Sequence, residues 1–104
     1  MPTFTNGNKK YTLKYNLESI EAIENMTGKS VINEIAETKG MLPVSDARAF
    51  FTTALYTVPD GEKVKAEEAN EIFNQIANSD YISVCENIGI SVVNDCPFLF
   101  RNAI

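Results

Sequence analysis

Histidine is missing from this 104-residue sequence. Among side chains it is the commonest general base, the usual partner of a serine or cysteine nucleophile, and the commonest metal ligand. The two cysteines stand eleven positions apart and do not make a zinc site without it. The five glycines are dispersed, so neither a P-loop nor a dinucleotide-binding loop is present. We therefore expect a protein that is not an enzyme and has no catalytic residues, metal or cofactor.

Cysteines and long apolar runs are also scarce. Cys85 and Cys96 are too few for a disulfide framework, and we expect free thiols rather than a bridge between them. No apolar run approaches the ~20 residues that a membrane span needs. The first four residues, 1–4, lack the charged and apolar regions of a signal peptide. These features predict a soluble, cytoplasmic protein.

Positive charge is limited as well. Nine basic residues face 14 acidic ones, which gives a formal charge of −5. The basic residues are scattered, and the densest pair, Lys9 and Lys10, falls in a predicted hairpin. Affinity for nucleic acid comes largely from lysine and arginine releasing phosphate counterions. We therefore expect neither nucleic acid nor an anionic membrane surface as a partner.

The sequence does contain a clear β-hairpin signal over residues 1–15. Asn6-Gly7 is a strong turn signal, because both residues tolerate positive φ. In the run that follows, Tyr11, Leu13 and Tyr15 alternate with polar residues, which is typical of a strand with one face on a core. A lone hairpin is marginal in water, so we expect it to pack on helices or pair with another edge.

Apolar residues at helical spacing fill most of the remaining chain. Asn16 is a candidate N-cap and Gly28 a candidate stop for the first helix, and Ser45 is a candidate N-cap for the central one. Ser79 or Asp80 can cap the last helix, which Gly89 weakens. The predicted helices span residues 17 to about 27, 30 to about 40, and 45 to 58; a fourth begins near residue 66, and a fifth follows the cap at 79 or 80 and ends at Pro97. The central helix carries the strongest stripe, made of Ala47, Phe50, Phe51, Ala54, Leu55 and Val58.

The expected fold class is mainly α with an N-terminal β-hairpin (α+β), with about five short helices around one core. One domain is expected over residues 1–104, since domains cluster near this size. It divides into the hairpin (1–15), a helical region (16–95) and a C-terminal tail (96–104).

Carboxylates are the only abundant reactive groups. Glu18, Glu21 and Glu24 share one helix surface, which would suit a cation site or an acid–base pair, but a solvated acidic face explains them better. Cys85 as a nucleophile has no base to activate it and falls on an apolar stripe, where we expect a core residue.

The apolar tail is the candidate partner-binding segment. Phe98, Leu99 and Phe100 follow the helix-ending Pro97 and belong to no periodic element. Two interpretations stay open. The three residues fold back to cover the hairpin sheet, or they form an exposed patch for a partner.

Taken in order, several segments resemble a known family. The run 11–16 leads directly into the helix at 17–24, and a short helix at 30–32, an aromatic helix at 49–55 and a Glu-rich helix at 66–69 precede a last helix from Tyr81. This order is similar to that of the tail assembly chaperones of long-tailed phages, prophages and gene transfer agents. The resemblance covers roughly residues 11–94. Thr53-Ala54-Leu55 stands where that family often has an aromatic-small-Gly-Leu run.

The resemblance implies a non-enzymatic chaperone that binds and solubilises the tape measure protein, or another tail protein, during tail assembly. It also implies self-association, a location in the cytoplasm of the bacterial host, and absence from the mature virion. The main alternative is a structural virion component, such as a head–tail connector or minor tail protein. An enzyme that uses the three glutamates, and a helix-turn-helix regulator formed by 17–27 and 30–38, are further alternatives.

Overall fold

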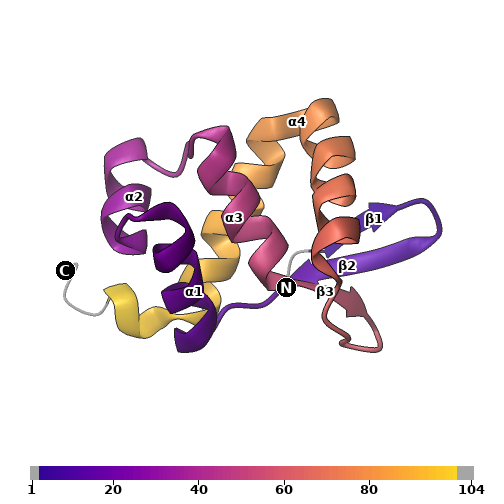
Figure 1. Ribbon diagram of the computed structural model, residues 1–104, viewed down its shortest axis with the longest axis horizontal. Helices are drawn as coiled ribbons and strands as arrows, with labels where there is room; N and C mark the ends of the chain where they lie inside the picture. The colour runs from indigo at the N-terminus through magenta and orange to yellow at the C-terminus, as the bar shows by residue number, and fades with distance from the viewer. Residues whose placement is uncertain (1–2, 101–104) are drawn as a thin grey trace.

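The computed structural model describes residues 3–100, so residues 101–104 of the predicted tail lie outside it. The described chain is mostly helical, with a sheet at one end of the long axis and α1 and α2 at the other (Figure 1). Its elements are, in chain order, β1 (Thr3–Asn6), β2 (Lys9–Leu13), α1 (Leu17–Thr27), α2 (Val31–Thr38), α3 (Val44–Ala54), β3 (Leu55–Val58), α4 (Ala66–Asp95) and the 3₁₀ helix η1 (Pro97–Phe100).

The predicted hairpin is confirmed. β1 and β2 pair antiparallel with Asn6 opposite Lys9, so Gly7 and Asn8 form the turn. Gly7 alone of these two has positive φ, at 64°, as expected for a two-residue hairpin loop with glycine in its first position. The apolar side of β2 is buried, with Tyr11 and Leu13 at most 2% exposed.

A third strand, β3, completes the sheet in the order β1-β2-β3, with β3 antiparallel to β2. The sequence predicted helix through Val58, and this was wrong. The helix stops at Ala54, whose carbonyl accepts a hydrogen bond from Lys14 N–H at 2.9 Å. Leu55 then pairs with Leu13 across the sheet. The otherwise unpaired edge of β2 thus supplies backbone partners that a longer helix would leave unused.

Both helix caps predicted for α1 are present. The Asn16 side chain accepts from Ser19 N–H at 2.8 Å, and the Ser19 hydroxyl accepts from Asn16 N–H at 2.8 Å, which makes a capping box. Gly28 ends the helix with φ of 71°. The cap predicted at Ser45 was wrong. The N-cap is Pro43, two residues earlier, and its fixed φ suits the start of α3 at Val44 without a side-chain bond.

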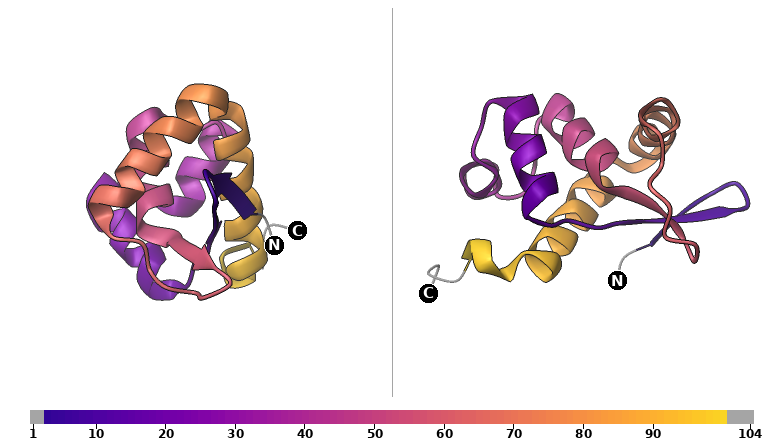
Figure 2. Two further views of the ribbon diagram at one scale, coloured as in Figure 1. Left: turned by 90° about the vertical axis from the view of Figure 1, so that its right-hand side faces the viewer. Right: turned by 60° about the horizontal axis from the view of Figure 1, so that its bottom comes forward.

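The described residues form four α-helices, whereas about five were predicted. The difference arises in α4, which holds the last two predicted helices as two arms. Asp80 departs from helical geometry (φ −157°, ψ 83°), and its side chain accepts from Ser83 N–H at 3.1 Å, like an N-cap. The arms diverge from this bend (Figure 2). The predicted break is therefore present as a kink within one element.

Buried apolar side chains from the sheet and the helices form a single cluster. Phe51 of α3 lies at its centre, with ring centroids 5.3 Å from Phe4 of β1 and 5.5 Å from Phe73 of α4, both in edge-to-face geometry. Tyr15 holds the other end of the core, because its hydroxyl donates to the Phe50 carbonyl at 2.9 Å. Cys85 and Cys96 are buried free thiols, as expected.

Candidate partner-binding surfaces

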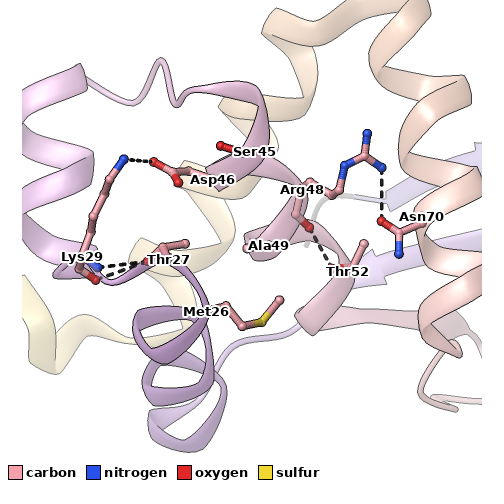
Figure 3. Close-up of a pocket in the computed structure, with 9 residues that line it drawn as sticks. All are labelled: Met26, Thr27, Lys29, Ser45, Asp46, Arg48, Ala49, Thr52 and Asn70. Atoms are coloured by element: carbon pink, nitrogen blue, oxygen red, sulfur yellow. Dashed lines mark hydrogen bonds and ion pairs between the residues drawn. The ribbon is translucent and has the colours of Figure 1, made fainter.

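A groove of about 490 Å³ lies at the junction of α1, α3 and α4 (Figure 3). Polar side chains make up much of its lining, and most of them already have a partner within the chain. The Arg48 guanidinium donates to the Asn70 side chain at 3.1 Å and lies 4.7 Å from the centre of the Phe73 ring. The Thr52 hydroxyl donates to the Arg48 carbonyl at 2.8 Å. The bond from Arg48 to Asn70 joins α3 to α4, whereas that from Thr52 lies within α3, and we assign no ligand to this groove.

A charged cluster at one end of the same groove joins α2 to α3. Lys29 Nζ lies 2.8 Å from Asp46 and 3.5 Å from Glu34, and both carboxyl groups are buried. A hydrogen bond between the two carboxyl groups requires one shared proton. This bond, together with burial, raises the pKa of Glu34. Burial alone would raise the pKa of Asp46, but the same bond and the Lys29 ammonium lower it. Glu34 is therefore the carboxyl group of the pair that takes up a proton first as pH falls.

The three glutamates of α1 do not act as one group. Glu18 and Glu21 are exposed, whereas Glu24 is half-buried and accepts a hydrogen bond from Val31 N–H at 2.9 Å. Glu24 thereby satisfies a free backbone group at the start of α2. The acidic face is thus solvated at Glu18 and Glu21, and its third member has a structural role.

The predicted partner-binding tail forms η1, and its three residues differ in exposure. Phe98 is 51% exposed, while Leu99 and Phe100 pack partly against the core. η1 lies at the α1 end of the molecule, opposite the sheet (Figure 1), so the tail does not cover the hairpin as one interpretation expected. Leu99 instead borders a shallow groove of about 350 Å³ with Leu17 and Ile20 of α1.

A second apolar surface, which sequence reasoning missed, lies on the outward side of α4 after Asp80. Its residues are Ile82, Ile90 and Val93, which are 57%, 50% and 50% exposed. We call these three the outer face of α4. The opposite side of the same arm is fully buried through Val84, Cys85, Ile88 and Val92. The signal in the sequence was an arm that is apolar on both sides, which is unusual for a helix at the surface of a protein.

Comparison of the chain with models of protein families, with curated proteins and with solved structures finds no match. Within residues 3–100, no helix is long and apolar enough to cross a membrane. The same residues contain no cluster of three or more side chains that could ligate a metal ion.

Proposed function

We propose that this chain is a non-enzymatic tail assembly chaperone of a phage or prophage, which binds the tape measure protein and keeps it soluble. The observation that carries the proposal is the outer face of α4. Three large aliphatic side chains stand half-exposed on one side of a helix whose other side fills the core. Such a two-sided arm is expected where a partner covers the outer side.

The size of this face suits reversible binding. Full burial of an aliphatic side chain contributes about 1.5–3 kcal/mol, so covering the exposed halves of three of them contributes on the order of 2–4 kcal/mol. Association also costs translational and rotational freedom. A single contact of this kind is therefore weak, as a chaperone that must release its client requires.

The order of segments that resembles the tail chaperones supports the finer part of the proposal. On that basis the protein acts in the cytoplasm of the bacterial host, self-associates, and is left out of the finished particle. The exposed Phe98 beside the groove of α1 would give the client a further apolar contact.

Under the proposal a tape measure protein is encoded in the same phage or prophage, and co-expression with that protein is the test. The test variant carries Ile82→Gln, Ile90→Gln and Val93→Gln. A matched control carries Ile32→Gln, Met41→Gln and Val44→Gln, which removes exposed apolar side chains from another surface, 39%, 47% and 55% exposed. We expect the tape measure protein to stay soluble with the wild type and the control and to precipitate with the test variant.

Two results would overturn the proposal. One is a tape measure protein that stays soluble with the test variant as it does with the wild type. The other is recovery of this chain in purified particles in fixed proportion to the tail proteins, which would make it a structural component.

A further inference from the structure

Gly89 lies in the second arm of α4, where nothing described in the chain requires a glycine. Its φ is not positive, and a Cβ built on it would meet no atom within 4 Å. Glycine is, after proline, the least favourable residue inside a helix. An alanine would therefore fit and would favour the helix. Gly89 therefore leaves open space on the surface of the helix that the described fold does not use.

The position of Gly89 relates it to the outer face of α4. A helix advances about 100° per residue, so Gly89 and Val93 both fall within about 20° of the direction of Ile82. Gly89 thus lies among the three aliphatic side chains and leaves a notch between them. Where a small residue stands at the contact, two helices approach to the lower end of the usual distance, about 8 Å. The notch is shaped for the backbone or a side chain of a crossing helix.

The charge around this face selects the partner. Residues 66–100 contain six carboxylates and no lysine or arginine. One of them, Glu86, is exposed and lies within about 40° of Ile82 on the same side of α4. A second copy of this chain would bring another Glu86 to the contact and, from its residues 66–100, no lysine or arginine. A cationic partner instead gains complementary charge.

We propose that the outer face of α4 binds an amphipathic helix that carries lysine or arginine beside its apolar stripe and crosses α4 at Gly89. This inference rests on the proposed function and adds to it the chemistry of the client segment. The apolar residues enter the surface around the notch, and the basic residues lie near Glu86 and the other carboxylates of α4.

The test uses two variants at one position. Gly89→Ala and Gly89→Gln both favour the helix, but only glutamine fills the notch. The probe is a leucine–lysine peptide of about 18 residues, long enough to form a helix, labelled for fluorescence anisotropy. A second peptide has the same leucines with glutamate in place of lysine. Circular dichroism checks that each variant is folded.

We expect the lysine peptide to bind the wild type and Gly89→Ala with similar affinity, and Gly89→Gln at least about tenfold more weakly. We expect the glutamate peptide to bind the wild type at least about tenfold more weakly than the lysine peptide does. Equal affinity of Gly89→Gln and the wild type, or of the two peptides, would overturn the inference. So would a dimer of the chain that Gly89→Gln dissociates, because a second copy would then cover the face.

Failure of this inference is distinguishable from failure of the proposed function. If Gly89→Gln still keeps the tape measure protein soluble, the crossing at Gly89 is wrong and the chaperone proposal stands. If the peptides behave as expected but the wild type does not keep the tape measure protein soluble, the inference about the helix stands and the proposed client is wrong.

Discussion

The pH dependence of stability in a Glu34→Gln variant tests the interaction between the buried carboxyl groups of Glu34 and Asp46. In the folded protein the hydrogen bond with Asp46 and burial raise the pKa of Glu34 above its ordinary value of 4.5. Folding therefore favours the protonated form of Glu34. The resulting stability is fully present below pH 4.5 and is lost as pH rises through the raised pKa. Asp46 acts in the opposite sense, since its lowered pKa adds stability that is lost as pH falls.

Glu34→Gln keeps a donor facing Asp46 but has no proton to lose. We therefore expect the variant to gain stability relative to the wild type as pH rises above 4.5. One proton is involved, so the difference in free energy of unfolding grows by at most about 1.4 kcal/mol per pH unit. It becomes constant once pH passes the folded pKa of Glu34. Carboxyl groups other than Asp46 titrate in both proteins and cancel in the difference.

Urea unfolding between pH 4 and pH 8, in steps of about half a unit, measures this difference, with the linear extrapolation applied at each pH. The exposed Glu37 of α2 offers a matched control, because Glu37→Gln removes the same charge from the same helix outside the pair. We expect the control to differ from the wild type by a small amount without the rise. A Glu34→Gln difference that stays flat with pH, or a variant less stable than the wild type throughout, would refute the shared proton.

Three further changes test the fold that supports these surfaces. Phe51→Ala removes a fully buried ring that two other phenylalanines contact, and we expect urea unfolding to show a loss of about 3–5 kcal/mol; a loss below about 1 kcal/mol would contradict its central place. Asn16→Ala breaks the capping box with Ser19 and we expect it to cost about 1 kcal/mol in thermal unfolding, whereas an unchanged midpoint would mean that the cap is unimportant. Cys85 and Cys96 are buried, so a thiol reagent is expected to label them only as fast as the protein opens, and rapid labelling of the native protein would contradict their burial.

Local patterns predicted the elements whose signals are contained within a few residues. The hairpin turn at Gly7, the cap at Asn16 and the stop at Gly28 depend on neighbours within four positions, and all three are present. β3 was not predicted, because Leu55 and Val58 also continue the apolar stripe of α3. What decides between helix and strand there is the free edge of β2, more than forty residues away in the chain. Periodicity in one window contains no information about that edge.

The candidate binding surfaces could likewise be predicted only in part from periodicity. Periodicity assigned Val84, Cys85 and Ile88 to the core side of the last arm, and they are buried. Periodicity predicted no role for Ile82 and Val93, because an apolar residue outside the main stripe is common at protein surfaces. The interaction between Glu34 and Asp46 could not be predicted from the sequence either, because only the packing of α2 on α3 brings these two carboxyl groups together.

The distribution of charge along the fold bears on how such a protein would hold a long client. Five of the nine basic residues belong to the sheet and the loops around it, and α1 and α4 contain only acidic charge. The acidic residues of α4 give this part of the surface a negative field, which acts over the Debye length of about 8 Å at physiological salt. The field speeds the approach of cationic segments, but the few half-exposed aliphatic side chains of the outer face limit the strength of each contact. Firm retention then requires several contacts at once. Under the proposed function, a long helical client would supply them by presenting repeated segments to several copies of this chain.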